Sequence, residues 1–444
     1  MIDMEFMTGT TKKETLELCE ILEGDYIGST VRVNGAIHTI RDMGDVAFVV
    51  LRKREGLLQC VYEEGVAQFA LGLLKEAATV EAEGVLEDEE RAPNGVELRL
   101  HTIRILSEPS EQLPLTIAKW KLDTSLEAKL NYRPVSLRNV RERAKFRIQE
   151  GLVRGFRDFL YGQGFTEIHT PKLGAKSAEG GANLFKLEYF HRPAILQQSP
   201  QFYKQMMVGV FDRVFETAPV FRAEKHNTKR HLNEYTSLDF EMGYIEGFED
   251  IMEMETGYLQ YTMALLEREY GRELKLLGVS LPNTERIPCV RFDEAKRQVA
   301  EKYHHQIRNP YDLEPEEEAL IGRYYQEECG ADFVFVTHYP SRKRPFYAMD
   351  DPEDDTFTLS FDLLFRGLEV TTGGQRIHSY PELMQKMEKR GMSEEGMEQY
   401  LSTFRYGMPP HGGLGIGMER LTMQLLGEEN VREVTLFPRD LSRL

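Results

Sequence analysis

A cation-rich segment separates two strand-like stretches near the middle of the sequence. Arg222 and Glu224 end the first stretch, His231 lies in the polar loop, and Tyr235 and Asp239 belong to the second. An arginine fork can hold a phosphate through two parallel hydrogen bonds, and a tyrosine ring can stack on a base. These residue types are compatible with a nucleotide site. A surface hairpin with ordinary ion pairs is the commoner explanation for such a segment taken alone.

Two carboxylates, Asp362 and Glu369, lie in an apolar, strand-like run. On neighbouring strands they could share magnesium ions that bridge ATP phosphates, because magnesium usually takes one or two carboxylates together with phosphate oxygens. The alternative is a pair of solvated carboxylates, although the surrounding run is more apolar than a free surface usually is.

Two further segments place polar groups at the start of a helix. The glycine-rich stretch 411–417 ends at Gly417 and precedes a helix-like run with Arg420, where glycine lets a ligand approach the backbone and the helix start favours an anion. The stretch 198–204 places Gln201 and Lys204 at a strand-to-helix junction. The alternatives are a glycine-rich turn and a helix cap with a surface lysine.

These segments need a scaffold, and the sequence from residue 141 onward predicts an α+β domain. A long helix is expected over 141–163, with Leu152, Phe156 and Leu160 on one face and Gly164 at its end. A strand over 166–173, stopped by Pro171, follows it. Beyond that point strand-like and helical runs alternate, which favours an antiparallel sheet flanked by helices.

The N-terminal part predicts a different architecture. Short β-branched runs within 28–108, separated by Gly and Asn-Gly breaks, are typical of a five-stranded barrel of the oligonucleotide-binding (OB) type. A helix is expected over 65–77. Residues 1–27 form an N-terminal extension, and the proline-containing stretch 109–140 is predicted to be a linker or hinge to a domain over 141–444.

Net charge, cysteine spacing and missing motifs limit the classes of protein to which the chain can belong. The chain has 444 residues and a net charge of -18, which by itself argues against a nucleic-acid binder, although 51–54 and 138–147 are locally basic. Four widely spaced cysteines and the lack of a signal peptide or membrane-length apolar run predict a cytoplasmic protein without membrane attachment. The sequence has no glycine-lysine phosphate loop.

In their order and spacing, these segments together resemble the signature of class II aminoacyl-tRNA synthetases. The strand that ends at Pro171 resembles motif 1, the dimer element, whereas 221–242 resembles motif 2 and 413–421 resembles motif 3. The stretches QSPQFYKQ, FRAEKHNTKRHLNE and FDLLFRGLEVTTGGQRIH are very similar to those of aspartyl-tRNA synthetases of the archaeal type. The resemblance implies a homodimeric ligase that uses ATP and Mg²⁺ to join L-aspartate to tRNA.

The resemblance also implies roles for individual residues. Those expected to bind ATP are Arg222, Glu224, His231, Tyr235, Glu369, Gly417 and Arg420, of which Arg222 and Arg420 carry the catalytic charge. Asp362 and Glu369 would hold the metal ion. Those expected to bind aspartate are Glu179, Gln201, Lys204, Asp239 and Arg376. A pocket with both Lys204 and Arg376 suits a carboxylate, since an amide would leave one cation unpaired.

The OB-type barrel would then read the anticodon of tRNA-Asp. The resemblance implies base contacts for Arg41, Phe48 and Gln59, although a phenylalanine on a barrel strand is usually a core residue. Enzymes restricted to tRNA-Asp have a tryptophan and a lysine where this chain has His38 and Pro93. The departure implies a relaxed enzyme that also accepts tRNA-Asn.

Three other functions remain open from the sequence. An asparaginyl-tRNA synthetase shares the class, but Arg376 and Lys204 argue against it. A synthetase-like amidoligase that needs no tRNA would have no use for the barrel at 28–108. A non-catalytic RNA-binding paralogue would have no reason to keep Arg222, Glu369 and Arg420.

Overall fold

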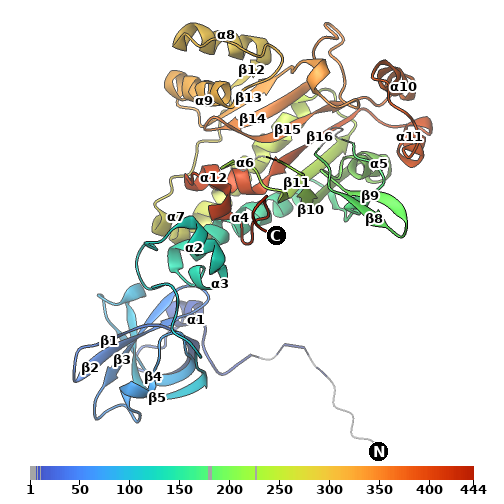
Figure 1. Ribbon diagram of the computed structural model, residues 1–444. Helices are drawn as coiled ribbons and strands as arrows, with labels where there is room; N and C mark the ends of the chain where they lie inside the picture. Colours follow the sequence, from blue (N-terminus) through green and yellow to red (C-terminus); the bar gives the residue numbers. More distant parts are fainter. Residues whose placement is uncertain (1–6, 8, 11, 179–182, 226–227) are drawn as a thin grey trace, which may run out of the picture. The chain divides into compact units, whose positions relative to one another are not determined.

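The computed structural model describes residues 7, 9–10, 12–178, 183–225 and 228–444. The chain divides into two compact units, Met1–Glu142 and Arg143–Leu444, and the boundary falls inside one long helix, α4 (Val140–Gly162) (Figure 1). No helix in these described ranges is both long and apolar enough to cross a bilayer.

The first unit is built on the predicted five-stranded OB-type barrel. The strand order is β1-β2-β3-β5-β4, and β4 pairs back onto β1. The strands are β1 (Thr30–Asp42), β2 (Val46–Arg52), β3 (Leu57–Glu63), β4 (Thr79–Asp88) and β5 (Val96–Ser107). Alternate side chains such as Ala47, Val49 and Leu51 fill the interior, as a period of two requires. The short helices of this unit are α1 (Leu18–Glu23), α2 (Leu126–Asn131) and α3 (Arg133–Ser136).

The helix expected over 65–77 is wrong. Only a 3₁₀ turn forms there, η1 (Leu71–Leu73), within an irregular strap. The apolar side chains of Phe69, Leu71 and Leu74 pack against the barrel core, and the Phe69 ring lies 5.4 Å from that of Tyr62. Contact with the barrel therefore keeps this segment irregular and outweighs its weak helical pattern.

The second unit contains an eight-stranded sheet in the order β12-β13-β14-β15-β16-β11-β10-β6. Its interior pairings are antiparallel, as predicted, and only the outermost pairs β12–β13 and β6–β10 are parallel. The strands are β6 (Thr166–Glu167), β10 (Arg213–Phe221), β11 (Glu234–Gly243), β12 (Cys289–Arg291), β13 (Phe333–Thr337), β14 (Ser360–Phe365), β15 (Leu368–Arg376) and β16 (His411–Gly417).

A smaller three-stranded sheet has the order β7-β9-β8, with β7 (Leu173–Gly174), β8 (Lys186–Tyr189) and β9 (Arg192–Leu196). The single strand expected over 166–173 is therefore wrong in extent. Thr166–Glu167 pairs with the large sheet and Leu173–Gly174 pairs with the small one, so the chain changes sheets across Pro171. Proline has no backbone N–H to donate to a ladder, which is consistent with a break at this position.

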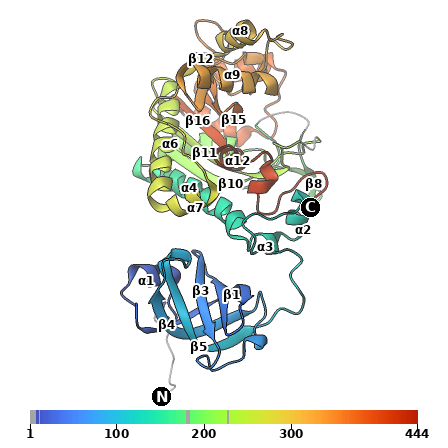
Figure 2. The ribbon, with the colours of Figure 1, turned by 90° about the vertical axis from the view of Figure 1, so that its left-hand side faces the viewer.

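Helices α4 and α6 cover one face of the large sheet, and α8 and α9 pack against the opposite face of β13 and β14. Helix α4 extends over the predicted residues and packs beside α6 (Figure 2). Phe156 of α4 makes edge contacts with Phe215 of β10 and Tyr258 of α6. The other helices of this unit are α5 (Gln201–Phe211), α6 (Glu249–Glu269), α7 (Gly271–Leu277), α8 (Phe292–Tyr303), α9 (Pro315–Cys329), α10 (Tyr380–Lys389), α11 (Glu398–Arg405) and α12 (Met418–Leu426).

Strand β11 has apolar side chains on one face of the sheet and charged side chains on the other. Leu238, Phe240 and Met242 point into the helix-covered core, so the alternating Asp239 and Glu241 point to the opposite face. The alternation of apolar and charged residues in LDFEM (238–242) therefore determines which face of the sheet carries the charged side chains.

Candidate active site

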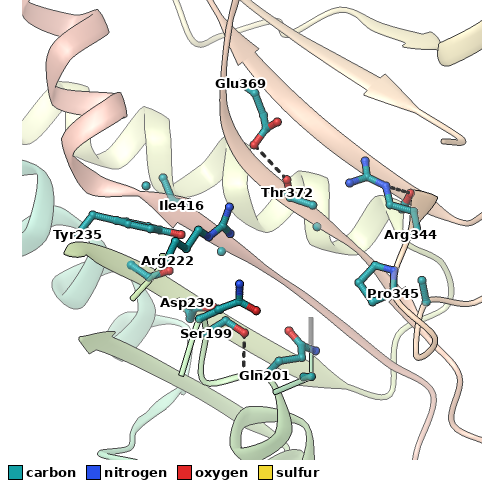
Figure 3. A pocket seen from close by; sticks show the side chains of 18 of the residues that line it. Ser199, Gln201, Arg222, Tyr235, Asp239, Arg344, Pro345, Glu369, Thr372 and Ile416 are labelled. Atoms are coloured by element: carbon teal, nitrogen blue, oxygen red, sulfur yellow. Dashed lines mark hydrogen bonds between the residues drawn. The ribbon is translucent and has the colours of Figure 1, made fainter. Parts of the chain in front are cut away.

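A pocket of about 600 Å³ lies on the polar face of the large sheet, beside β11, β15 and β16. Figure 3 shows the side chains of Arg222, Tyr235, Asp239 and Glu369 around it. The predicted residues that line this pocket are Gln201, Lys204, Arg222, Glu224, His231, Tyr235, Asp239, Glu369, Arg376, Gly417 and Arg420. The fold thus brings together all four segments that the sequence singled out.

Lys204, Arg376 and Asp239 line one end of the pocket, and the fully buried Glu241 pairs with both cations behind this lining. Lys204 Nζ lies 2.9 Å from Asp239 Oδ1 and 3.3 Å from Glu241 Oε2, and it donates to the Leu414 carbonyl at 2.8 Å. Arg376 donates through Nε to Glu241 Oε1 at 2.9 Å and through Nη2 to the Gly413 carbonyl at 2.8 Å. Both cations are thereby held in fixed positions.

Glu241 is the residue that joins the two cations, and the sequence interpretation did not include it. Burial alone would raise its pKa, but the charges of Arg376 and Lys204 outweigh burial and hold the pKa of Glu241 below its ordinary value. It therefore remains ionised. Its place two residues after Asp239, on the same face of one strand, was the available signal.

The glycine-rich stretch 411–417 is the central strand β16 and lies directly under these carboxylates. Gly413 pairs with Glu241, and Gly415 pairs with Asp239. A Cβ at Gly413 would lie 2.2 Å from Glu241 Oε2, and a Cβ at Gly415 would lie 3.0 Å from Asp239 Oδ1. Glycine is therefore needed in this strand because the two buried carboxylates occupy the space of its side chains.

The other end of the pocket is lined by arginines. The Arg222 guanidinium lies 5.6 Å from the centre of the Tyr235 ring, and Arg420 Nη1 donates to the Glu369 carbonyl at 3.2 Å. Burial and the neighbouring Arg420 lower the pKa of His231, which favours a neutral imidazole at pH 7. Two residues outside the predicted set, Arg230 and Thr372, also line the pocket.

Asp362 lies behind the pocket wall on β14. Arg344 Nη2 donates to Asp362 Oδ1 at 2.7 Å, and the Arg344 guanidinium lies 3.9 Å from the centre of the Tyr339 ring. Burial raises the pKa of Asp362 to about 6, and Glu369 adds to the effect while Arg344 opposes it. Arg344 follows β13 in an irregular segment, so no periodic pattern could predict its contact with Asp362.

One predicted residue lies outside the described ranges, and the predicted anticodon residues lie in the barrel. Glu179 is not among the described residues. Arg41 pairs with Phe48 across β1 and β2, and Gln59 alternates with the buried Leu58 and Cys60, so it faces outward. Phe48 is half-buried and also faces outward, because its neighbours Ala47 and Val49 fill the interior.

The two positions tied to tRNA choice differ in exposure. His38 is only 3% exposed and falls at the irregularity in the β1–β2 pairing between Ile37 and Thr39. Pro93 is exposed at the start of the turn η2 (Pro93–Gly95). Pro93 can therefore meet a ligand as it stands, whereas His38 could do so only after local rearrangement.

The fold and the pocket define a class II aminoacyl-tRNA synthetase. Residues 125–441 match the family described as tRNA synthetases class II (D, K and N), and residues 31–106 match the OB-fold nucleic acid binding domain family. The chain belongs to the class II tRNA synthetase family of the D, K and N type.

Individual relatives show which members of this family the chain resembles. The chain is 47% identical to the aspartate–tRNA(Asp/Asn) ligase of Deinococcus radiodurans, over 94% of this chain and 96% of the relative. It is 45% identical to the ligase of the same description from Thermus thermophilus, over 94% and 97%. A crystal structure of asparaginyl-tRNA synthetase from Pyrococcus horikoshii with asparaginyl-adenylate is similar at a TM-score of 0.88 and 30% identity, with coverage of 97% and 99%.

Glu255 of α6 gives a testable pH dependence. It is fully buried on the helix side of the sheet, where Thr371 donates to it at 2.5 Å, and burial raises its pKa to about 8. The unfolded chain releases this proton near the ordinary value of 4.5, so Glu255 makes stability fall as pH rises from about 4.5 to 8.

We expect Glu255→Gln to remove this dependence. Its free energy of unfolding, measured by urea titration at several pH values, should fall less steeply than that of the wild type, by up to about 1.4 kcal/mol per pH unit. Glu253→Gln, an exposed position on the same helix, is the control and should follow the wild type. Parallel profiles for Glu255→Gln and the wild type would contradict the assignment.

Proposed function

We propose that this protein is an aspartate–tRNA ligase that activates L-aspartate with ATP and transfers it to tRNA-Asp and to tRNA-Asn. The observation that carries the proposal is the presence of Lys204 and Arg376 in the same pocket as Arg222 and Arg420. The names of the Deinococcus and Thermus relatives support the same activity.

Recognition of aspartate rests on the two cations at one end of the pocket. Lys204 and Arg376 would bind the side-chain carboxylate, while Asp239 and Glu241 keep both cations in place. Asparagine would present amide hydrogens to at least one of these donors and leave it unpaired. Gln201, and Glu179 outside the described ranges, would position the α-amino end.

ATP would occupy the arginine-lined end. Arg222 would bind the α-phosphate, Tyr235 would stack on adenine, and Glu224 would accept from the adenine edge. His231 and Arg420 would meet the γ-phosphate. The backbone at Gly417 is accessible, because an added Cβ there would approach nothing closer than 3.8 Å.

The carboxylates of Glu369 on β15 and Asp362 on β14 are oxygen donors of the kind that magnesium takes, and Asp362 is paired with Arg344 behind the pocket wall. Glu369 lines the pocket, Asp362 lies on the neighbouring strand, and the repulsion between them helps to raise the pKa of Asp362. Asp362 and Glu369 would hold the ion, with phosphate oxygens completing its coordination. Bound there, it would neutralise charge on the ATP phosphates.

The chemistry follows from positioning and charge. The α-carboxylate of aspartate attacks the α-phosphorus of ATP in line, the bond to the bridging oxygen breaks, and pyrophosphate leaves. Arg222 and Arg420 stabilise the negative charge that develops on the phosphates. The terminal hydroxyl of tRNA then attacks the carbonyl carbon of the aspartyl-adenylate, and AMP leaves.

The outer face of the barrel would bind the anticodon. Arg41, Phe48 and Gln59 lie on strands β1, β2 and β3 with outward-facing side chains. This combination of aromatic and polar side chains suits unstacked bases, because an aromatic ring can stack on a base while polar side chains hydrogen-bond to its edges. With His38 and Pro93 in place of tryptophan and lysine, the barrel would tolerate both anticodons.

Amino-acid choice is tested by ATP–pyrophosphate exchange. We expect exchange with aspartate and little with asparagine, which also decides against the activity named for the Pyrococcus structure. Lys204→Met should raise the KM for aspartate by about a hundredfold or more, since it removes one partner of a buried charge pair. The KM for ATP should stay near the wild-type value.

Lys296→Met is the matched control for that variant. Lys296 is also buried in an ion pair, 2.7 Å from Glu317, but it does not line this pocket. It should lower the melting temperature without changing the KM for aspartate. Preferred exchange with asparagine by the wild type would overturn the assignment.

tRNA choice is tested by charging tRNA-Asp and tRNA-Asn transcripts side by side. We expect aspartylation of both by the wild type. Pro93→Lys should slow charging of tRNA-Asn more than that of tRNA-Asp, because the new side chain lies at an exposed position expected near the third anticodon base. Absence of aspartyl-tRNA-Asn would remove the relaxed specificity from the proposal and leave the aspartate activity.

A homodimer formed through the region near Pro171 is also proposed. The large sheet ends at the two-residue strand β6, where Tyr161 donates to Glu167 and remains 53% exposed. An exposed aromatic side chain at an open sheet edge suits a self-association surface. Sedimentation equilibrium should give about twice the chain mass of 51.3 kDa, and a monomer at micromolar concentration would refute the dimer.

A further inference from the structure

Glu318 reaches the arginine-lined end of the pocket from helix α9, which belongs to none of the segments singled out from the sequence. Its side chain is only 7% exposed. Glu318 Oε2 accepts from Arg230 Nη1 at 3.1 Å and from the backbone N–H of Glu369 at 3.3 Å. It therefore contacts two residues of the pocket wall from behind.

These contacts belong to a closed ring of four residues. Arg420 Nε donates to the Arg230 carbonyl at 3.4 Å, and Arg420 Nη1 donates to the Glu369 carbonyl at 3.2 Å. Arg230 and Glu369 are in turn joined by Glu318. The ring ties α9 to the loop between β10 and β11, to β15 and to α12.

The backbone of α9 packs in close contact with the turn that leads into β15. A Cβ at Gly322 would lie 2.3 Å from the Gly367 nitrogen, and a Cβ at Gly367 would lie 2.8 Å from the Ala319 Cα. Gly367 also has a φ of +76°, which favours glycine. This close packing fixes the distance from α9 to Glu369. It therefore also fixes the position of the Glu318 carboxylate.

A carboxylate is an unfavourable choice for this place unless orientation matters. Burial and the like charge of Glu369 raise the pKa of Glu318 to about 7, and Arg230 and the Glu369 N–H counteract only part of this effect. An apolar side chain would avoid the repulsion but would leave Arg230 without its buried acceptor. Charge-assisted bonds of this kind fix donors before a ligand arrives.

We propose that Glu318 is a positioning residue for ATP, which acts by holding Arg230 and the Glu369 backbone in the orientation that receives the phosphates. The inference rests on the proposed function, because it takes the arginine-lined end as the ATP site. Glu318 itself touches no reacting atom in this scheme. The acidic helix α9 is thereby part of the nucleotide site.

The test compares Glu318→Gln with Glu317→Gln in the full-length protein. Glu317 is the adjacent, fully buried carboxylate, and its Oε2 lies 2.7 Å from Lys296 rather than in the ring. ATP binding with Mg²⁺ is measured by calorimetry without aspartate, and the KM values for ATP and aspartate are measured by exchange. Melting temperatures are recorded for all variants.

We expect Glu318→Gln to weaken ATP binding and raise the KM for ATP by about tenfold to a hundredfold, with the KM for aspartate unchanged. Glu317→Gln should lower the melting temperature and leave ATP binding as in the wild type. Wild-type ATP binding by Glu318→Gln, or the same weakening in both variants, overturns the proposal.

A double-mutant cycle with Arg230→Gln tests whether Glu318 acts on ATP affinity through its contact with Arg230. The effect of Glu318→Gln on ATP affinity should nearly vanish in the Arg230→Gln background, since both changes break the same contact. Additive effects overturn the proposal. If the wild type binds ATP but shows no exchange with aspartate, only the proposed function is contradicted. The ATP affinities of the variants would still test the role of Glu318.

Discussion

Two cations and two carboxylates lie buried together at one end of the pocket, and much of the catalytic unit is arranged to keep them there. Buried charges are costly unless they are paired and hydrogen-bonded. Lys204 and Arg376 meet this condition through Asp239, Glu241 and two carbonyls of β16. The requirement extends into the sheet, because β16 must be glycine wherever those carboxylates lie over it. If the two cations bind a substrate carboxylate as proposed, that one requirement accounts for the glycines of a central strand.

The opposite end of the pocket is lined by arginines, and in the proposed function it would receive the phosphates of ATP. Arg420 donates to the carbonyls of Arg230 and Glu369, and the Arg230 guanidinium donates to Glu318 of α9. Acidic groups behind the pocket wall therefore fix the orientation of cations in front of it. This arrangement also reconciles a net charge of -18 with a site for polyanions.

The barrel and the catalytic unit use one rule, the alternation of side chains along a strand, for opposite purposes. In β11 the alternate positions place charge on the face away from α4 and α6. In β2 they place Phe48 on the outer surface, where an aromatic ring can meet a base. The bulge at His38 interrupts this alternation in β1 and buries a side chain that the regular pattern would have left outside.

The fold class, the OB-type barrel, the span of α4 and the segments that line the pocket could be predicted from the sequence, because periodicity and spaced polar residues are local properties. Prediction from the sequence failed at 65–77 and at 166–173, where contact with the barrel and a change of sheet decided the structure. Only the tertiary structure decided that Arg344 would engage Asp362, that Glu241 would join Lys204 to Arg376, and that Glu318 would reach Arg230. These contacts join residues from separate elements, and their distances depend on how helices and turns pack, which no local pattern encodes.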